Sequence, residues 1–306
     1  MAIQKGMDLS KRLDQSVTLK DGRRLGFAEV GYSAGLPVVY CHGFPASRLE
    51  SVLIAQAAER QRARIIAPDR PGYGLSDLKP ARTIGSWADD VAQLADYLGI
   101  ERFSVLGTSG GGPYGLALAA QLPDRVDAVG IICGLGLLDD PEAMQAMHWP
   151  ARFGFGAARS APRMLRLIYG EFLGRLIFRN PEVALSLLAL GSPASDRSTL
   201  TRPEIKAALC ASVREALRLG GEGAVQDMIL YAHDWGIDLA QIRMPTTFWH
   251  GEADVTVPLS HALALAERLP HAQVFTFPGE GHFSLPIDRA DEIIKTLIES
   301  IKRGNP

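Results

Sequence analysis

Cysteine is scarce in this sequence, and its few copies follow no metal-binding or disulfide pattern. Cys41, Cys133 and Cys210 stand far apart among 306 residues. They lie in apolar or alanine-rich surroundings, without the paired spacing of a zinc site or the dense, even-numbered spacing of a disulfide scaffold. We therefore expect three reduced thiols, which is typical of a cytoplasmic protein.

An excess of charge of one sign is also missing. The 32 Lys and Arg nearly balance the 34 Asp and Glu, which gives a formal net charge of −2. Proteins that bind nucleic acid or anionic membranes carry basic patches, so this balance predicts no nucleic-acid and no membrane partner. A small-molecule substrate is the expected partner, and the sequence leaves homo-oligomer formation open.

Long hydrophobic runs are absent as well. The longest, residues 129–138, contains glycine and is shorter than the roughly 20 apolar residues of a membrane-spanning helix. The first 16 residues contain no apolar stretch of the kind that marks a secretory signal. A hydrophobic content of 47% is nevertheless ample for a packed core. We expect one large cytoplasmic domain, or a domain with an insertion.

Glycine, in contrast, is concentrated around one serine. A short β-type run at residues 103–106 is followed by Gly107-Thr108-Ser109-Gly110-Gly111 and then by an alanine- and leucine-rich helix. A serine between a strand and a helix, with glycine two positions before and two after it, is the pattern of a nucleophile elbow. The glycines leave room for a sharp turn, and the N-terminus of the helix stabilises negative charge beside the serine. The pattern predicts that Ser109 is a nucleophile.

A glycine-rich turn of this kind has two other interpretations. A dinucleotide-binding loop needs G-x-G-x-x-G and an acidic residue about 20 positions later, and Gly110-Gly111-Gly112-Pro113 does not provide that spacing. A plain glycine-rich turn is common in α/β folds. Only further residues at neighbouring strand ends can decide against it.

Predicted strands alternate with predicted helices on both sides of the elbow. Besides residues 103–106, the expected strands cover residues 16–20, 24–30, 36–41, 64–67, 126–133, 245–250 and 272–277. Helices are expected at about 47–61, 83–98, 112–121, 260–269 and 288–301, with Asp288 as the cap of the last. This alternation predicts an α/β fold with a mostly parallel eight-stranded sheet flanked by helices.

The alternation is interrupted by a helical segment of about a hundred residues. Helical pieces are expected at 141–147, 162–178, 181–190, 203–219 and 223–233, several of them starting at proline. We divide the chain into a first part of the core (1–134), a helical cap or lid (135–235) and a second part of the core (236–306). An all-helical insertion between core strands is typical of a lid over a site.

A serine nucleophile needs a base and a group that orients the base. His282 follows the last predicted strand and Asp254 follows the one before it, so both reach the sheet edge where Ser109 lies. The chain order Ser, Asp, His is that of the α/β-hydrolase arrangement. The main rivals of Asp254 as the acid are Asp139 and Asp140.

The oxyanion donors follow from the same logic. The backbone N–H of Gly110, next to the nucleophile, is one expected donor, and a loop after the third strand supplies the other. Phe44 is that second donor, because Pro45 has no N–H. We expect His42 to fix the shape of this loop by hydrogen bonding. The predicted substrate contacts are His42, Phe44, Tyr114 and Phe283.

No cofactor is predicted. His250, Glu252 and Asp254 follow one strand closely and could suggest metal ligands. One catalytic acid with two uninvolved neighbours explains them better, so we expect no metal and no organic cofactor.

With these residues in place, the chain resembles the α/β-hydrolase superfamily over nearly its whole length. The matching motifs are His42-Gly43-Phe44-Pro45, Asp69 to Asp77, Gly107 to Gly111, His250 to Asp254 with Val257-Pro258, and Gly281-His282-Phe283. The resemblance implies the same roles for Ser109, Asp254 and His282, the oxyanion donors Phe44 and Gly110, a structural loop at residues 69–77, and a cap domain.

The reaction is less closely defined by the resemblance. Ser109 argues against haloalkane dehalogenases and epoxide hydrolases, which carry Asp at the nucleophile position. His42-Gly-Phe-Pro-Ala46 differs from the His-Gly-Gly-Pro-Gly of proline iminopeptidase-like members. C–C bond (meta-cleavage) hydrolases have Trp where Phe283 follows the histidine, and cofactor-free haloperoxidase- or perhydrolase-like members share the loop at residues 42–45.

Three hypotheses follow. The favoured one is a serine hydrolase of small apolar carboxylic esters, as in the carboxylic ester hydrolase class. The alternative is a C–C hydrolase of a diketone-like or dienoic acid, which would need an anion site such as Arg152, Arg159, Arg163 and Arg166 of the cap could provide. A non-enzymatic ligand receptor is the least favoured, because a complete triad would then have no use.

Overall fold

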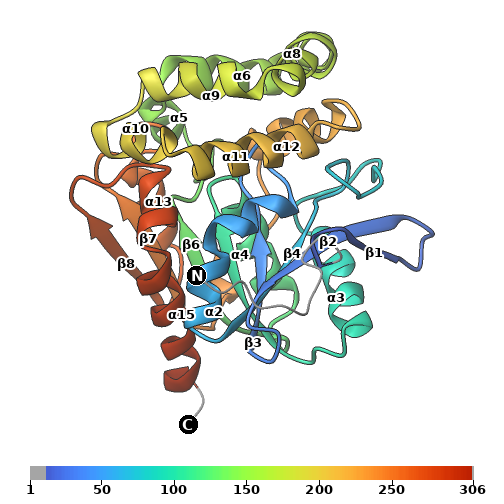
Figure 1. Ribbon diagram of the computed structural model, residues 1–306, viewed down its shortest axis with the longest axis vertical. Coiled ribbons are helices and arrows are strands. Elements are labelled where there is room, and N and C mark those ends of the chain that lie inside the picture. The colour runs from blue at the N-terminus through green and yellow to red at the C-terminus, as the bar shows by residue number, and fades with distance from the viewer. Residues whose placement is uncertain (1–11, 305–306) are drawn as a thin grey trace.

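The computed structural model describes residues 12–304, and over this range the strands form one eight-stranded sheet (Figure 1). Its order is β1-β2-β4-β3-β5-β6-β7-β8. The strands are β1 (Gln15–Thr18), β2 (Arg24–Gly31), β3 (Leu36–Cys41), β4 (Ala63–Pro68), β5 (Phe103–Thr108), β6 (Val126–Ile132), β7 (Thr246–Gly251) and β8 (Ala272–Phe277). β1 and β2 form an antiparallel hairpin, β2 pairs antiparallel with β4, and the other pairs are parallel.

Helices cover both faces of the sheet, which is why its central strands are buried on both sides. Every residue of β5 and β7 is buried. One face packs against α3 (Trp87–Tyr97), α4 (Gly111–Gln121) and α13 (Leu259–Ala266), and the other against α2 (Ala55–Arg60) and α15 (Ala290–Gly304). The expected α/β class, with a mostly parallel eight-stranded sheet and an inserted helical region, is confirmed.

The inserted helices between β6 and β7 lie over the carboxyl ends of the strands. Figure 1 shows them in two layers, with α6, α8 and α9 outermost and α11 and α12 between those and the sheet. The helices are α5 (Pro141–Ala146), α6 (Trp149–Ser160), α7 (Pro162–Leu165), the π-helical η2 (Arg166–Leu173), α8 (Gly174–Arg179), α9 (Pro181–Leu190), α10 (Ala194–Leu200), α11 (Pro203–Ala216) and α12 (Glu222–Tyr231). We call this region the cap; its division from the core at residues 134/135 and 235/236 stays a prediction.

Several elements differ locally from expectation. α3 begins at Trp87 rather than Thr83, because Thr83 and Ser86 bond each other's backbone N–H in a turn before it. The helix after Ser47 starts as the 3₁₀ helix η1 (Arg48–Ile54). Asp288 does not cap α15: it ends α14 (Ser284–Asp288) and accepts a hydrogen bond from Thr199 in the cap. α6 and α10 were not expected.

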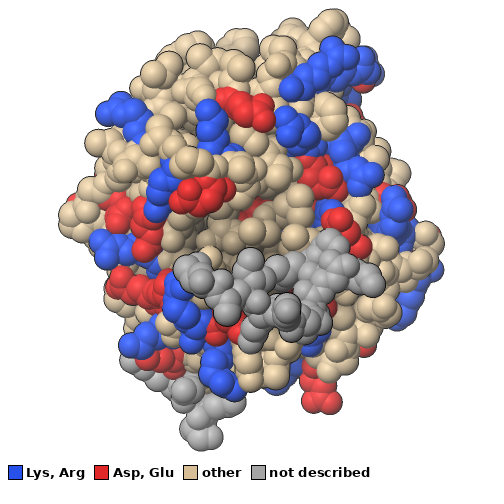
Figure 2. Space-filling model, viewed as in Figure 1, with Lys and Arg blue, Asp and Glu red and all other residues tan. Residues whose placement is uncertain are grey.

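The surface agrees with the balanced charge of the sequence. Figure 2 shows Lys and Arg side chains interspersed with Asp and Glu over the face in view. Within residues 12–304 no helix combines the length and the apolar character needed to cross a membrane. Cys41, Cys133 and Cys210 are buried and free of disulfides, as expected.

Candidate active site

Ser109 lies in the turn between β5 and α4, in the left-handed region of backbone conformation at φ 54°. Such a φ is uncommon for a residue with a side chain and is typical of strained functional turns. The flanking glycines make the turn sterically accessible. A Cβ on Gly107 would lie 2.7 Å from the carbonyl oxygen of Gly111, and a Cβ on Gly111 would overlap the carbonyl oxygen of Cys41. The elbow pattern therefore has a steric reason at both glycines.

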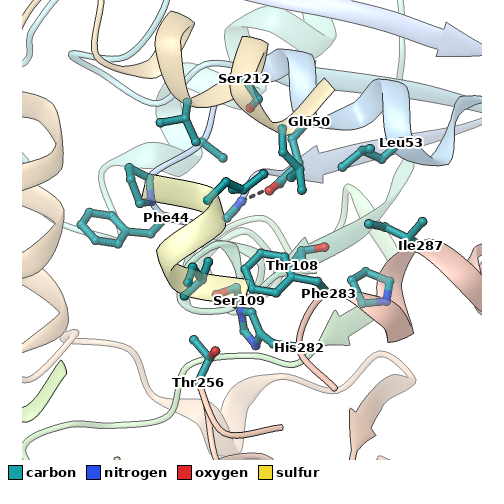
Figure 3. A pocket seen from close by; sticks show the side chains of 18 of the residues that line it. Phe44, Glu50, Leu53, Thr108, Ser109, Ser212, Thr256, His282, Phe283 and Ile287 are labelled. Carbon is teal, nitrogen blue, oxygen red and sulfur yellow. Dashed lines mark hydrogen bonds between the residues drawn. The ribbon is translucent and has the colours of Figure 1, made fainter. Parts of the chain in front are cut away.

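The structure brings Ser109, His282 and Asp254 together in one hydrogen-bonded chain. His282 Nε2 lies 3.0 Å from Ser109 Oγ, and His282 Nδ1 lies 2.7 Å from Asp254 Oδ2. In the neutral ring, Nδ1–H donates to Asp254, which leaves Nε2 to accept from the serine hydroxyl. Figure 3 shows the His282 ring directly beside Ser109 at the base of a cavity. This is the geometry that activation of a serine requires.

Charge around His282 favours its protonated form. Burial alone lowers the pKa of His282, but the adjacent Asp254 carboxylate outweighs burial, and the pKa is raised above its ordinary value. Asp254 shows the converse: burial raises its pKa, the neighbouring His282 lowers it, and the net shift is downward. Asp254 Oδ1 also accepts from the N–H groups of Thr256 and Val257, both at 2.8 Å. The carboxylate is thus held ionised and in fixed orientation.

A second carboxylate, Asp196 of α10, holds the histidine loop from the cap side. It is fully buried and accepts from the backbone N–H of His282 (2.9 Å), Phe283 (2.9 Å) and Ser284 (2.8 Å). A Cβ on Gly281 would overlap this carboxylate, so glycine there lets the carboxylate approach. Sequence reasoning missed Asp196, because an acid in the first turn of a short helix has the same pattern when it only stabilises that helix.

Two backbone N–H groups beside Ser109 have no acceptor among the described residues: those of Gly110 and Phe44. These are the two predicted oxyanion donors. The loop that carries Phe44 is fixed by its neighbours, since Gly43 N–H donates to Glu50 Oε2 at 2.7 Å. On the other side, the Tyr231 hydroxyl of α12 donates to the Gly110 carbonyl at 2.8 Å.

His42 supports the same loop from beneath. Its Nε2 accepts from the N–H of Arg70 at 3.2 Å, and its Nδ1–H donates to the Gly43 carbonyl at 2.9 Å. Burial, together with Arg70, lowers its pKa well below the ordinary value, so the ring is neutral. His42 does not line the cavity. The predicted shaping contact is present, and the predicted substrate contact has no support.

A cavity of about 260 Å³ opens above Ser109 and His282 (Figure 3). Its walls come from both core and cap. The apolar lining is Phe44, Pro45, Ala46, Leu53, Ile54, Leu185, Leu188, Leu209, Val213, Phe283, Pro286 and Ile287, and the polar side chains in it are Tyr40, Glu50, Thr108, Ser109, Ser212, Thr256 and His282. No Lys or Arg lies among these residues. A site of this kind takes a small, largely apolar molecule.

Other predicted residues lie elsewhere. Tyr114 was expected to contact substrate, but it is buried below the elbow and its hydroxyl bonds Asp227 at 2.6 Å. Asp140, a rival for the acid, caps α5 through the N–H of Glu142. The four cap arginines considered as an anion site are exposed on the outer helices: Arg152, Arg159, Arg163 and Arg166.

Two further histidines of the core have structural contacts. His250 is buried, and its Nε2–H donates to the carbonyl of Val257 at 2.8 Å. His261 is buried and bonds the backbone of Gly136 and Ala143. Neither ring faces the cavity.

One group of side chains has the composition of a partial metal site. Single donor atoms of Cys133, Asp254 and His282 lie within 4.8 Å of one another. Burial raises the pKa of Cys133 well above its ordinary value, and its thiol donates to the Gly281 carbonyl oxygen at 3.8 Å. The other two are already bonded to each other. We therefore assign this group to the serine–histidine–aspartate chain and not to a metal.

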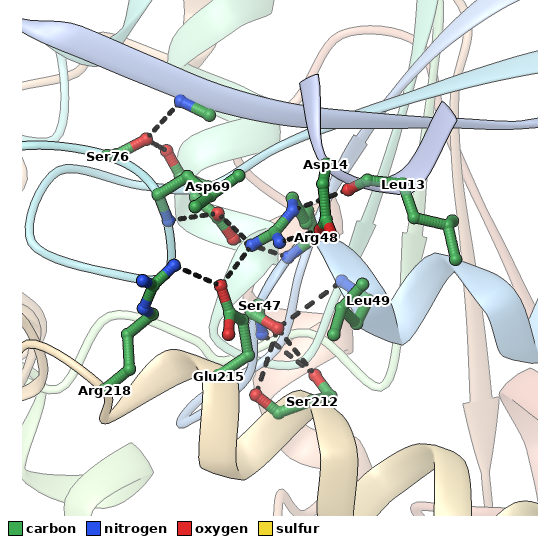
Figure 4. Close-up of polar contacts among 12 residues, drawn as sticks. Leu13, Asp14, Ser47, Arg48, Leu49, Asp69, Ser76, Ser212, Glu215 and Arg218 are labelled. Atoms are coloured by element: carbon green, nitrogen blue, oxygen red, sulfur yellow. Dashed lines mark hydrogen bonds and ion pairs between the residues drawn. The ribbon is translucent and has the colours of Figure 1, made fainter. Parts of the chain in front are cut away.

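Two buried polar clusters anchor the inner helices of the cap to the core. Asp227 of α12 accepts from Arg70, Arg82, Tyr73 and Tyr114. In the second cluster, Arg48 of η1 bonds Asp69 of the core and Glu215 of α11, each at 2.8 Å, and also Asp14 (Figure 4). Ser47 and Ser212 bond beside it. Each cluster ties a residue of the cap to a loop that follows a core strand.

Comparison with known proteins places this arrangement among related folds. A model of the alpha/beta hydrolase fold family matches residues 37–288. The 2-hydroxymuconate semialdehyde hydrolase of Pseudomonas putida is 27% identical over 270 residues, which cover 87% of this chain and 86% of that protein. A thermophilic esterase from Thermogutta terrifontis aligns over 96% of this chain and 99% of its own, with 22% identity and a TM-score of 0.66.

A bromoperoxidase from Bacillus anthracis aligns over 94% of this chain and 99% of its own, with 20% identity and a TM-score of 0.70. Because these structural identities are low, the two solved structures establish a shared fold and nothing finer.

Proposed function

This chain belongs to the alpha/beta hydrolase fold family, and on that premise we propose that it is a serine hydrolase of small, largely apolar carboxylic esters. The observation that carries the proposal is the hydrogen-bonded chain Ser109–His282–Asp254 at the base of an apolar cavity. A serine hydroxyl that bonds an oriented, neutral imidazole is the nucleophile of acyl transfer.

The first half of the proposed reaction forms an acyl-enzyme. Ser109 Oγ attacks the ester carbonyl carbon while His282 Nε2 takes the hydroxyl proton. Negative charge develops on the carbonyl oxygen, where the N–H groups of Gly110 and Phe44 would bind it. The resulting imidazolium is stabilised by Asp254 and passes its proton to the departing alcohol oxygen as the C–O bond breaks.

The second half releases the acid. A water molecule takes the position of the alcohol, and His282 Nε2 removes a proton from it as its oxygen attacks the acyl carbon. The same two N–H groups bind the second oxyanion. The proton on His282 then returns to Ser109 Oγ as the acyl–oxygen bond breaks, so the enzyme is regenerated and a carboxylic acid leaves.

A C–C bond hydrolase is the second candidate, and the similarity to the Pseudomonas putida hydrolase favours it. The lining of the cavity disfavours a substrate that carries a carboxylate. Its lining contains the carboxyl group of Glu50 and no Lys or Arg, while Arg152, Arg159, Arg163 and Arg166 are exposed elsewhere. An acid substrate would meet a carboxyl group of the same charge in a site of low dielectric. Esters without a carboxylate fit this lining better.

The proposal is tested by labelling and turnover together. A fluorophosphonate should give one adduct, on Ser109 by peptide mapping, and His282→Ala should abolish it. Ser109→Ala should lower kcat/KM for a phenyl ester by about 10⁴-fold or more. Ser104→Ala is the matched control, because Ser104 lies on the same strand, is buried and has no hydrogen-bond partner among the described residues.

Unlabelled but folded protein, or full ester turnover by Ser109→Ala, would contradict the assignment. If a meta-cleavage product acid were turned over with a higher kcat/KM than any phenyl ester, the proposed function would instead be that of a C–C hydrolase.

A further inference from the structure

Glu50 places a carboxyl group on the wall of an otherwise largely apolar cavity. It lies in the first turn of η1 and lines the same cavity as Ser109 and His282. Figure 3 shows its side chain reaching toward the loop that carries Phe44. The sequence motifs described above do not include Glu50 and give no role for its carboxyl group. Glu50 is partly buried, and a carboxyl group in such a setting costs free energy unless hydrogen-bond donors pair with it.

Only one of its two oxygens is occupied by the protein. Glu50 Oε2 accepts from the N–H of Gly43 at 2.7 Å and from the Tyr40 hydroxyl at 2.9 Å. Oε1 receives no hydrogen bond from any described residue. Burial raises the pKa of Glu50, and the bonds from Gly43 and Tyr40 offset burial only in part. Glu50 therefore contacts the loop through Oε2 alone, and a glutamine amide oxygen could accept the same two bonds.

The position of the free oxygen defines where a partner would sit. Gly43 precedes Phe44, whose N–H is a proposed oxyanion donor, and Glu50 lies near enough to His282 to raise the pKa of the imidazole. A group bonded to Glu50 in this cavity would therefore lie near the reacting carbonyl. The second and third carbons of an acyl chain are those nearest that carbonyl, so a donor on one of them is the substituent to test.

We propose that Glu50 Oε1 is an acceptor for a hydrogen-bond donor on the acyl chain of the substrate, which makes short hydroxy- or amino-acyl esters the preferred class. The inference rests on the proposed function and narrows it. The same carboxyl group disfavours acyl chains that end in a carboxylate. The rest of the cavity lining is largely apolar, so the other parts of the substrate should be small and apolar.

Four phenyl esters of nearly equal size test the preference in the wild-type protein. Phenyl 3-hydroxybutanoate and phenyl 3-aminobutanoate carry a donor, phenyl 3-methylbutanoate is their apolar counterpart, and monophenyl succinate carries a carboxylate. A hydrogen bond to a charged group is stronger than one between neutral groups. We expect kcat/KM for the two donor esters to exceed that for the methyl ester by about 10-fold or more, and monophenyl succinate to be the poorest.

Glu50→Gln then separates substrate recognition from loop support. Gly43 N–H and the Tyr40 hydroxyl would select the amide oxygen, which turns the NH₂ group toward the cavity and replaces an acceptor by a donor. The ratio of kcat/KM between the amino and methyl esters should fall to about 1, because an ammonium group cannot accept from the NH₂ group whereas a hydroxyl can, and monophenyl succinate should improve relative to both. A role in loop support alone would lower kcat/KM for all four esters by one common factor.

Thr256→Val is the matched control. Thr256 lines the same cavity, and this nearly isosteric change removes a hydroxyl but no carboxyl group, so the ester ratio should stay at the wild-type value. A wild-type ratio near 1, or a ratio that Glu50→Gln leaves unchanged, would overturn the proposal. The wild-type ratios remain decisive if the variant does not fold. Absence of turnover for every ester, together with no fluorophosphonate adduct, would instead refute the serine hydrolase.

Discussion

His282 is surrounded by acidic groups from three parts of the chain. Asp254 follows β7, Glu50 lies in η1 and Asp196 lies in α10, and all three raise the pKa of the imidazole against the opposing effect of burial. Short motifs in the sequence predicted the hydrogen-bonded partners His282 and Asp254. Glu50 and Asp196 could not be predicted in this way, because their approach to the histidine is created by packing between distant segments.

The raised pKa of His282 leads to a pH prediction. The proposed base works only when neutral, so kcat/KM should rise with pH through an apparent pKa above the ordinary histidine value of about 6.5. Asp196→Asn removes one charge that raises this pKa and leaves a single acceptor for three N–H donors. The rise should move to lower pH, and kcat should fall by about 10-fold because the histidine loop is less well held.

The Asp288→Asn variant separates the effect of charge on the pKa of His282 from the effect of a weaker link between the cap and the core. Asp288 also links the cap to α14, through Thr199 and Arg202, but it is not among the charges that raise the pKa of His282. This variant should change the rate at all pH values by a similar factor. A pH profile of Asp196→Asn that coincides with the wild-type profile would show that Asp196 acts only as a structural link.

At the scale of single elements, burial explains both the successes and the omissions of sequence-based prediction. The central strand β3 matches its predicted range because a continuous apolar run defines it, and the edge strand β8 matches its range although it is only partly buried. α6 was missed: it begins with an exposed Trp149, contains an exposed Phe153 and includes two glycines, so its apolar pattern does not mark a single buried face. α10 is short and is stabilised by contacts with other elements.

The crossing of α4 over β3 leads to a prediction at this scale. Gly111→Ala would press a methyl group against the Cys41 carbonyl, which forces α4 away from β3 and moves Ser109. We expect a loss of about 1–3 kcal/mol in the free energy of unfolding and at least about a 100-fold loss in kcat/KM. Denaturant titration and phenyl ester kinetics measure both.

Gly156→Ala in α6 is the matched control, since a Cβ there meets nothing within 4 Å. It should stabilise the protein by up to about 1 kcal/mol, because alanine favours a helix, and leave kcat/KM unchanged. Equal changes in the free energy of unfolding and in kcat/KM for Gly111→Ala and Gly156→Ala would mean that the close approach at Gly111 is not what positions Ser109.

For the whole molecule, the connection between cap and core is polar and buried. Asp227 lies among Arg70 and Arg82, which lower its pKa far enough to outweigh the effect of burial. Asp227 is separated from each of these arginines by more than 140 positions in the sequence. A single sequence shows an aspartate in a helix and two arginines in loops, and it gives no sign that they meet. The overall fold was predictable, but this attachment of the cap was not.

Removing the central charge should destabilise the molecule. Asp227→Asn leaves two buried guanidinium groups without a counterion, so we expect the free energy of unfolding at pH 7 to fall by about 3–5 kcal/mol. Asp89→Asn on the exposed side of α3 should change it by no more than about 0.5 kcal/mol. Similar unfolding midpoints for the two variants would show that the cap is held mainly by its apolar contacts.

The origin of each residue around the cavity has an evolutionary consequence. Ser109, Asp254, His282 and both proposed oxyanion donors belong to the core, whereas the cap supplies lining residues such as Leu185 and Leu209. Substitutions in the cap lining can therefore diversify substrate choice while the reacting groups are inherited unchanged. That freedom is limited where cap residues bond the core, at Asp196, Asp227 and Tyr231 and at Ser212 and Glu215 of the second cluster. A descendant could exchange most of its cap and keep its chemistry, provided that these contacts were retained or replaced together.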